Sequence, residues 1–394
     1  MRNVVGQTPR GADFFPREKI IAKIYRHLDA GAHLFLAAPR RVGKTSIMRA
    51  MEDRPRDGYH FVYVITESIH DVEEYYSKVL TAVLASDAIG ALAKKRDSLK
   101  KQIQEWLGNL SVSIKLPWGL EASLNADGTK ENKSFQTTFE EVLARLDTGE
   151  DTIVVMVDEF PQTVENIREK HGNLVAEQFL RINREQRQTT NARIRFILTG
   201  SIGLPAVVKK LTSDSVINDL TVVEIPALSE DEARKMTETL LGYYHIRYQP
   251  EMIDYLLQKL KWLIPFHVQL SVHELIDIYE SNGKILETAD VDKAFKSVLH
   301  LRNDIYFNHY YTRLNDSFPQ KEHKQFALDL LQQAATSDWV APEVVRDLSK
   351  KLSAQERDAV IEALLYDGYL VADNGKGYRF HSALLQQWWI KKQG

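Results

Sequence analysis

The first part of the chain alternates short apolar runs with amphipathic stretches. The runs are bounded by turn residues and are too short for helices, which is typical of buried strands. The stretches between them carry apolar residues at helical spacing, for example Phe139, Val142 and Leu143. Strands that alternate with helices predict an α/β fold with a mostly parallel, helix-covered sheet. The predicted strands are residues 34–38, 61–65, 153–157, 196–199 and 222–225.

This alternation is interrupted between about residues 86 and 133. A lysine-rich segment with helical spacing leads into residues 110–128, where apolar and polar positions alternate around Pro117 to Gly119. Period-2 alternation on both sides of a turn predicts a β-hairpin. We therefore predict an insertion with a hairpin inside the sheet domain.

A helical pattern begins after Pro226, where the apolar runs stop. Ser229 and Glu232 have the spacing of a capping box, which predicts the start of a helical region that extends to about Tyr311. This region has the character of a separate helical subdomain.

A third pattern follows from about residue 318. Helical spacing at residues 322–335, after Pro342 and from Ser353 to Tyr366 is followed by two short strands at residues 369–372 and 378–380. Three helices and a two-stranded ribbon are typical of a winged helix. The predicted domains are a sheet domain at residues 1–228, a helical domain at 229–317 and a winged helix at 318–394.

Composition restricts the chemistry of the 394-residue chain. Lys and Arg number 51 and Asp and Glu 54, a net charge of −3, so binding of nucleic acid would need a local basic patch. The absence of cysteine excludes thiol catalysis, zinc fingers and iron–sulfur clusters. No signal-peptide-like segment and no apolar stretch of membrane-spanning length is found, so we expect a cytoplasmic protein without a membrane partner.

The strongest chemical motif follows the first predicted strand. Residues 38–45 read APRRVGKT and fit the phosphate-binding pattern G-x-x-x-x-G-K-[ST] with Ala in the first place. Lys44 would neutralise the β- and γ-phosphates, the Thr45 hydroxyl would bind Mg²⁺, and Gly43 would allow close approach of the backbone. The candidate ATP-binding residues of the loop are Ala38, Pro39, Arg40, Arg41, Val42, Gly43, Lys44, Thr45 and Ser46.

Two adjacent carboxylates follow the strand at residues 153–157. Asp158 would support the metal through water, and Glu159, which points the other way, would polarise the attacking water as a general base. The pair could instead simply end a strand at the surface, but the phosphate loop favours the catalytic interpretation. The sequence thus assigns Lys44 and Glu159 to catalysis, and Thr45 and Asp158 to the metal.

Hydroxyl residues follow the strand at residues 196–199. Thr199 or Ser201 would contact the γ-phosphate or the attacking water if this strand end belongs to the site. A Thr-Gly-Ser sequence after a strand is also an ordinary turn. Both interpretations stay open at this point.

The sequence resembles the archaeal-type ATPases of the STAND branch, within the broader AAA+ and related P-loop ATPases. The resemblance covers nearly the whole chain and implies a P-loop sheet domain, a helical lid and a winged helix, with ATP bound between sheet and lid. It rests on PRRVGKTS, VDEFP, LTGSIGL, IPFHVQL, DGYL and YRFHSALLQQWW.

The resemblance also implies roles for residues outside the strand ends. Phe15 and Arg17 lie in FFPRE, which is similar to a box near the adenine in the family, with Pro16 in place of its Gly. Pro265 matches a lid proline near the nucleotide, although Ile264 replaces the usual Gly and a helix-kinking proline is the alternative.

Relatives often carry a Gly-Arg after the sensor strand that acts on a neighbouring nucleotide. This chain has no arginine in the corresponding residues 215–220. Arg181, Arg184 and Arg187 are candidates for such an arginine, and their spacing equally suits a solvated helical face.

These motifs together predict an Mg²⁺-dependent ATPase, slow or stimulated by a partner, that works as a conformational switch. ATP would be the input, and a separately encoded protein or self-assembly the output. The alternative is an ATP-dependent DNA-loading module that acts through the winged helix. The net charge of the chain does not support DNA binding. In the predicted winged helix, the basic residues Lys350, Lys351 and Arg357 are offset by acidic neighbours. A nucleotide-binding scaffold without catalysis is a third possibility.

Overall fold

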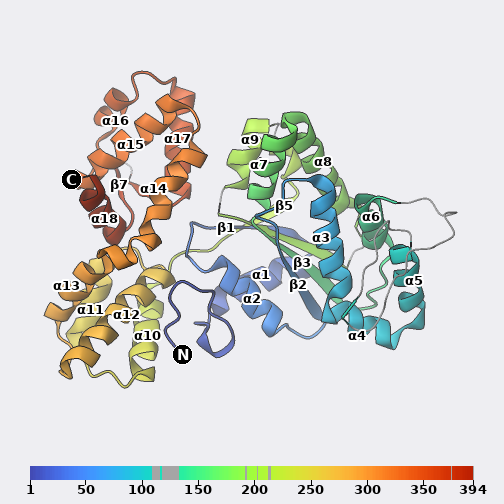
Figure 1. The fold of residues 1–394 in the computed structure, drawn as a ribbon, viewed down its shortest axis with the longest axis horizontal. Coiled ribbons are helices and arrows are strands. Elements are labelled where there is room, and N and C mark those ends of the chain that lie inside the picture. Colours follow the sequence, from blue (N-terminus) through green and yellow to red (C-terminus); the bar gives the residue numbers. More distant parts are fainter. Residues whose placement is uncertain are drawn as a thin grey trace. The chain divides into compact units, whose positions relative to one another are not determined.

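The computed structural model describes residues 1–108, 116–117, 133–190, 193–201, 203–211, 214–373 and 375–393 (Figure 1). The chain divides into two compact units. The first, here called the sheet unit, contains residues 17–37 and 47–224; the second, the helical unit, contains residues 1–16, 38–46 and 225–394. The predicted hairpin at residues 110–128 lies outside the described residues, except for Leu116 and Pro117.

The described part of the sheet unit contains a parallel sheet of five strands in the order β2-β3-β4-β1-β5. Every residue of β3 from Ile153 to Asp158 is buried, so both faces of this strand are covered. The predicted α/β fold is therefore confirmed. The strands are β1 (His33–Ala37), β2 (Tyr59–Ile65), β3 (Thr152–Asp158), β4 (Ile194–Thr199) and β5 (Leu220–Glu224).

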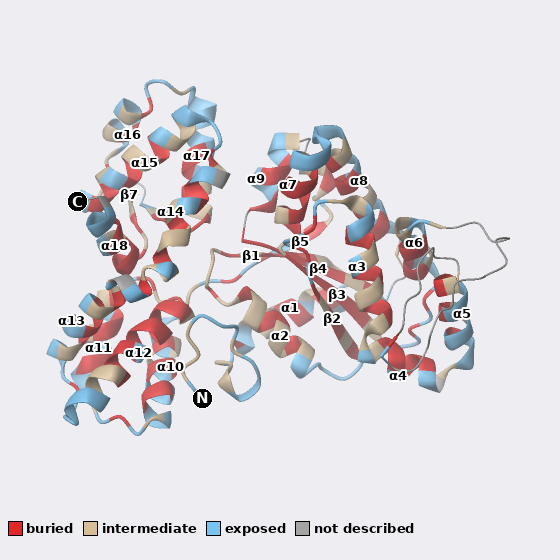
Figure 2. Cartoon of the chain, viewed as in Figure 1, coloured by how far each residue is buried: buried red, intermediate tan, exposed pale blue. Residues whose placement is uncertain are grey.

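The helices that cover the sheet turn their apolar sides toward it (Figure 2). Several begin at a side-chain cap; for example, Asp71 accepts the Glu73 N–H at the start of α3. The helices between the N-terminus and β5 are α1 (Glu18–Asp29), α2 (Lys44–Asp53), α3 (Val72–Ala85), α4 (Asp87–Lys95), α5 (Asp97–Gly108), α6 (Phe135–Arg145), α7 (Phe160–His171), α8 (Asn173–Thr189) and α9 (Leu204–Leu211).

The described part of the insertion is helical and belongs to the same core. Ile89 and Leu92 on α4, and Ile103 and Trp106 on α5, are buried in one hydrophobic cluster with residues of the sheet. Among the described residues, no single helix is long and apolar enough to cross a bilayer; α3 and α4 pass that test only together, as a pair bent by 50°.

The longest segment of the helical unit, residues 225–394, begins with helix α10. The predicted capping box of Ser229 and Glu232 at the start of this helix is confirmed. Pro265 occupies the first turn of α12, directly after the N-cap Ile264, and therefore begins this helix; the kinked-helix alternative is wrong. The helices of this segment are α10 (Glu230–Tyr243), α11 (Pro250–Leu260), α12 (Pro265–Asn282), α13 (Thr288–Val298) and α14 (Ile305–Ser317).

The last part of the helical unit has the predicted order of three helices and an antiparallel ribbon, closed by a further helix, α18. A bridge between Val340 and Tyr378 joins the ribbon to the segment before α16. Trp388 and Trp389 on α18 are buried. The elements are α15 (Lys321–Thr336), α16 (Pro342–Leu348), α17 (Ala354–Tyr366), β6 (Leu370–Asp373), β7 (Gly377–Phe380) and α18 (Ala383–Gln393). The division into lid and winged helix stays a prediction, because both segments belong to one compact unit.

Arg187, one of the three arginines considered for contact with a neighbouring nucleotide, is buried in an ion pair of the sheet unit. Arg187 on α8 is buried and binds Asp219 through two hydrogen bonds, Nε to Oδ2 at 2.6 Å and Nη2 to Oδ1 at 2.9 Å. Its Nη2 also donates to the Val216 carbonyl at 3.2 Å. Arg187 thus ties α8 to the segment before β5, and the hypothesis that it reaches a neighbouring nucleotide does not fit this position.

We expect Arg187→Ala to lower the free energy of unfolding by about 3–5 kcal/mol, because it leaves the Asp219 carboxylate without its partner in a poorly solvated place. Urea unfolding followed by circular dichroism measures this. The matched control is Arg181→Ala on the same helix, whose side chain is 58% exposed and pairs with Glu177; there we expect a loss of about 0.5 kcal/mol or less. Equal losses in the two variants would contradict the structural role of Arg187.

Candidate functional site

The phosphate loop connects the end of β1 to the start of α2. Its backbone enters the left-handed region twice, at Arg41 with φ of 65° and at Gly43 with φ of 101°. A Cβ atom placed on Gly43 would meet no protein atom within 4 Å, so the space beside this residue is open to a phosphate. Since α2 begins at Lys44, the loop also leads into a helix N-terminus, which favours anions. The loop therefore fits a phosphate group by conformation as well as by sequence.

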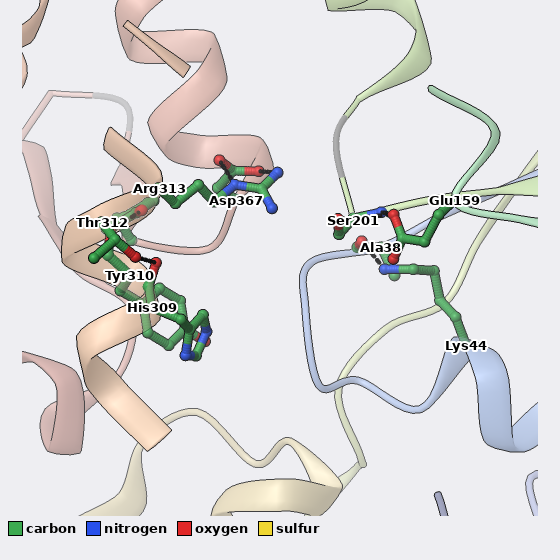
Figure 3. A network of polar contacts seen from close by, with 10 residues as sticks. Ala38, Lys44, Glu159, Ser201, His309, Tyr310, Thr312, Arg313 and Asp367 are labelled. Carbon is green, nitrogen blue, oxygen red and sulfur yellow. Dashed lines mark hydrogen bonds and ion pairs between the residues drawn. The ribbon is translucent and has the colours of Figure 1, made fainter. Parts of the chain in front are cut away.

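Lys44 lies across its own loop. Its side chain is largely buried, and Nζ donates hydrogen bonds to the Ala38 carbonyl at 2.7 Å and the Pro39 carbonyl at 3.1 Å (Figure 3). The ammonium group is thereby held over the loop that would carry the phosphates. A bound phosphate would compete with these carbonyl oxygens for its donors.

Arg41, at the tip of the loop, packs against helices of the helical unit. Its guanidinium carbon lies 3.9 Å from the ring centroid of Phe266 on α12, and its Nη2 lies 3.4 Å from Nδ1 of His309 on α14. Burial, followed by the charge of Arg41, lowers the pKa of His309 to about 3. His309 is thus neutral near pH 7 and can accept the Arg41 hydrogen bond, if Nδ1 is the unprotonated nitrogen.

The turn between α17 and β6 also contacts the loop. Gly368 has φ of 78°, and a Cβ atom placed there would lie 2.6 Å from Trp262 and 3.1 Å from Cβ of Pro39. The preceding residue, Asp367, binds Arg313 through two hydrogen bonds of 2.8 and 2.9 Å (Figure 3). The sequence alone indicates no role for this turn, although its DGYL segment carries part of the resemblance.

The negative charge of Asp367 interacts with positive charges of the phosphate loop. Burial raises the pKa of the Asp367 carboxyl, whereas Arg313, Arg40 and Lys44 each lower it through their positive charges. Two of these three cations belong to the phosphate loop. The loop therefore interacts with the α17–β6 turn by charge as well as by packing.

Asp158, at the end of β3, is held by hydrogen bonds on both carboxylate oxygens. Oδ2 accepts from the Tyr63 hydroxyl at 2.7 Å, and Oδ1 accepts from the Glu159 backbone N–H at 3.1 Å. Tyr63 lies on the neighbouring strand β2, and its ring packs 3.5 Å beneath the guanidinium carbon of Arg49. Burial, followed by the nearby Asp158, raises the pKa of Tyr63 far above its usual range, so the phenol stays a hydrogen-bond donor.

The chemistry of the predicted metal residues suits Mg²⁺. Asp158 offers a buried, oriented carboxylate, and Thr45, in the first turn of α2, offers a hydroxyl. Mg²⁺ prefers such hard oxygen donors and takes few of them from protein, because phosphate and water supply the rest. No group of three or more His, Cys, Asp or Glu side chains that could form an all-protein metal site is found among the described residues.

Glu159 and Ser201 meet after the ends of β3 and β4. Glu159 occupies the position before α7 with φ of 61° and ψ of 31°. Its Oε2 accepts hydrogen bonds from both the backbone N–H and the hydroxyl of Ser201, each at 2.8 Å (Figure 3). Thr199, fully buried, donates its hydroxyl to the Leu36 carbonyl of β1 at 3.1 Å. The structure thus joins Ser201 to Glu159 and Thr199 to β1, while a contact of either residue with the γ-phosphate stays a prediction.

The FFPRE box is divided between the two units. Phe15 belongs to the N-terminal residues of the helical unit, whereas Arg17 is buried in the sheet unit, where its carbonyl accepts the Ile20 and Ile21 N–H groups at the start of α1. The N-terminal residues are tied to α12, because Asn3 Nδ2 donates to the Gln269 carbonyl at 2.9 Å. The adenine-binding role of this box and of Pro265 stays a prediction.

Comparison with known families decides the class of the protein. Residues 14–246 match the profile of a family described as an ATPase domain predominantly from Archaea. The chain belongs to this ATPase family. The expected resemblance to archaeal-type P-loop ATPases is therefore confirmed, and binding of ATP or ADP follows from the family.

Solved structures agree on the fold of this archaeal-type ATPase. The Walker-type ATPase of Pyrococcus abyssi is similar with a TM-score of 0.66 at 18% identity, over 99% of this chain and 100% of that one. The ORC2 protein of Aeropyrum pernix, in ADPNP–ADP complexes, is similar with a TM-score of 0.52 at 13% identity, over 97% of both chains. No curated protein sequence matches this chain significantly.

We expect Tyr63→Phe to raise the Mg²⁺ concentration needed for half-maximal ATP hydrolysis by about tenfold or more, because partners that orient a metal-supporting carboxylate tune the affinity for the metal. Titration of hydrolysis with MgCl₂ at saturating ATP measures this. Tyr59→Phe is the control on the same strand, since the Tyr59 hydroxyl donates to Asp29 rather than to Asp158. An unchanged Mg²⁺ requirement in Tyr63→Phe would show that Tyr63 does not act on the metal residue.

Proposed function

We propose that this archaeal-type ATPase is an Mg²⁺-dependent molecular switch of the STAND type. It binds ATP, hydrolyses it slowly or on stimulation by a partner, and signals through a separately encoded protein or through self-assembly. The observation that carries the proposal is the contact of the phosphate loop with three parts of residues 225–394: Phe266 on α12, His309 on α14 and Gly368 before β6.

A switch requires contacts whose free energies differ between nucleotide states. Binding of phosphate at the loop would break the hydrogen bonds from Lys44 Nζ to the carbonyls of Ala38 and Pro39. Pro39 is also the residue that packs against Gly368. Arg41, on the same loop, contributes a cation–π contact of about 0.5–2 kcal/mol with Phe266. Any rearrangement of the loop by nucleotide therefore changes the stability of these contacts, which could bias a two-state movement of the helices.

The residues at the strand ends would perform the hydrolysis. Lys44 binds the β- and γ-phosphates, Thr45 and Asp158 hold Mg²⁺, and Glu159 accepts the proton of the attacking water. When bound, Mg²⁺ neutralises the charge that develops on the phosphate oxygens. The ADPNP–ADP complexes of the structurally similar ORC2 protein support a nucleotide at this fold.

We expect two substitutions to separate binding from hydrolysis. Lys44→Ala should weaken ATP binding by about 10- to 100-fold, because it removes charge-assisted hydrogen bonds to phosphate. Glu159→Gln should keep ATP affinity and lower kcat by about 100-fold or more, because the general base is lost. Calorimetry measures binding, and phosphate release measures turnover.

The control for these variants is Lys235→Ala, which removes an exposed lysine on α10. If Lys44→Ala keeps full affinity for Mg²⁺–ATP, the assignment of the phosphate loop fails. If Glu159→Gln hydrolyses ATP at the rate of the unaltered protein, the general base is another residue.

We further expect ATP to change amide hydrogen exchange at residues 264–270 and 365–370 in Glu159→Gln, and to leave the middle of α8 unchanged. The first two segments contact the phosphate loop, whereas α8 does not belong to the same unit. Mass spectrometry of the exchanged peptides measures this, with Lys44→Ala as the control that should show no response. Identical exchange with and without ATP would contradict the switch.

The DNA-loading alternative is tested in the same samples by adding duplex DNA. The basic residues of the C-terminal segment are balanced, since Lys350 pairs with Asp347 and Arg357 with Asp358. We therefore expect assembly, measured by light scattering, to depend on ATP and not on DNA. Salt-sensitive DNA binding that is lost on charge reversal of Lys350 and Lys351 would favour the alternative.

A further inference from the structure

A buried carboxylate lies beside the phosphate loop. It belongs to Asp367, which follows the last residue of α17 and is only 7% exposed. The next residue, Gly368, is so close to the loop that a Cβ atom placed on it would lie 3.1 Å from Cβ of Pro39. A loop that is expected to bind anionic phosphates therefore has a carboxylate as a neighbour.

Cations surround this carboxylate. Nε and Nη2 of Arg313, on α14, donate to its two oxygens at 2.8 and 2.9 Å (Figure 3). A guanidinium that donates to both oxygens favours the ionised form of a carboxyl group. Burial raises the pKa of Asp367, and the positive charges of Arg313, Arg40 and Lys44 oppose that rise. Arg40 and Lys44 belong to the phosphate loop, so the charge of Asp367 acts on the same cations that would attract phosphate.

The turn that carries the carboxylate is fixed on both sides. Gly368 packs against the phosphate loop, and the hydroxyl of Tyr369 donates to the Tyr310 carbonyl of α14 at 2.6 Å. The two hydrogen bonds from Arg313 hold the side chain of Asp367 in one orientation. The carboxylate therefore cannot leave the neighbourhood of the loop unless the ion pair breaks or the turn itself moves.

Stability of the fold is a weak explanation for a carboxylate at this position. Asp367 is the C-cap residue of α17, where the helix macrodipole disfavours negative charge. In a buried ion pair, the cost of removing both charges from water largely offsets their attraction. An effect on the neighbouring anion site accounts for the carboxylate better than stabilisation does.

We propose that Asp367 is a specificity-determining residue: its negative charge opposes phosphate at the loop and so disfavours ATP relative to ADP, and Arg313 limits this repulsion by neutralising part of the charge. Coulomb repulsion grows with the charge of the ligand, and ATP carries one negative charge more than ADP. The proposal rests on the proposed function, since it requires nucleotide at the phosphate loop. Because Asp367 is fixed to its turn, ATP and the packed position of this turn oppose each other reciprocally.

The test measures affinity for ATP and for ADP by calorimetry in two variants that break the same ion pair from opposite sides. Asp367→Asn removes the negative charge and should tighten ATP binding about five- to tenfold, the order expected for one unit charge acting through partly solvated protein, and ADP binding by less. Arg313→Gln removes the positive charge and should weaken ATP binding by a similar factor. If the pair were only a structural tie, both variants would change affinity in the same direction.

Two controls separate charge from geometry and from stability. Arg313→Lys keeps the positive charge and should bind ATP within about twofold of the unaltered protein. Asp219→Asn breaks a comparable ion pair, that of Asp219 with the buried Arg187. This pair lies before β5, whose first residue Leu220 pairs with His33 at the start of β1, whereas the phosphate loop follows the end of β1. Asp219→Asn should lower stability and leave both affinities unchanged. Thermal unfolding followed by circular dichroism establishes which variants are folded.

The outcomes distinguish this proposal from the proposed function. Unchanged affinities in folded Asp367→Asn and Arg313→Gln, changes in the same direction, or equal changes for ATP and ADP overturn the role of Asp367 and leave the ATPase assignment standing. If Asp367→Asn does not fold, Arg313→Gln decides alone, because it must weaken ATP binding more than ADP binding. Absence of ATP binding in the unaltered protein would instead overturn the proposed function.

Discussion

Parallel pairing of β1 with β4, and of β4 with β3, brings the turns that carry the predicted site residues to one edge of the sheet. Because all three strands run in the same direction, their carboxyl ends and the turns that follow them lie side by side. Thr199 Oγ1 donates to the Leu36 carbonyl and thereby ties the end of β4 to the end of β1. Ser201 ties the turn after β4 to the turn after β3 through Glu159. The phosphate loop begins at this edge, as the direct continuation of β1.

The turns after β1 and β3 contain unusual backbone conformations. Arg41 and Glu159 have positive φ values although neither is glycine, and Gly43 has one as well. Such conformations persist only where the surroundings determine them strongly, and they are frequent at functional sites. Here the surroundings are identifiable: Phe266 and His309 around Arg41, and Ser201 against Glu159. Two of the residues predicted to handle phosphate and water, Arg41 and Glu159, therefore lie in backbone conformations that their surroundings must stabilise.

The phosphate loop, where nucleotide is predicted to bind, contacts residues 225–394 of the helical unit. Phe266, His309 and Gly368 come from three elements far apart in the sequence, and each contacts the loop. Their presence is the physical basis for linking ATP to the arrangement of the helices, and it distinguishes the proposed switch from an enzyme that only hydrolyses ATP.

Local pattern was sufficient to predict the strands of the sheet, the phosphate loop, the Asp-Glu pair after β3 and the capping box that begins α10. Each of these depends on residues within a few positions of one another, and burial of a parallel strand leaves a continuous apolar run in the sequence.

Contacts between side chains that are distant in the sequence could be found only in the tertiary structure. It placed Arg187 in an ion pair with Asp219, where helical spacing had also allowed a surface arginine. It put the Tyr63 hydroxyl on Asp158 and directed the Ser201 hydroxyl to Glu159. Such contacts join side chains from different elements, so no periodicity along the chain encodes them. The sequence therefore predicted which residues would carry the chemistry, and only the packing of the elements determined how their protons and charges are held.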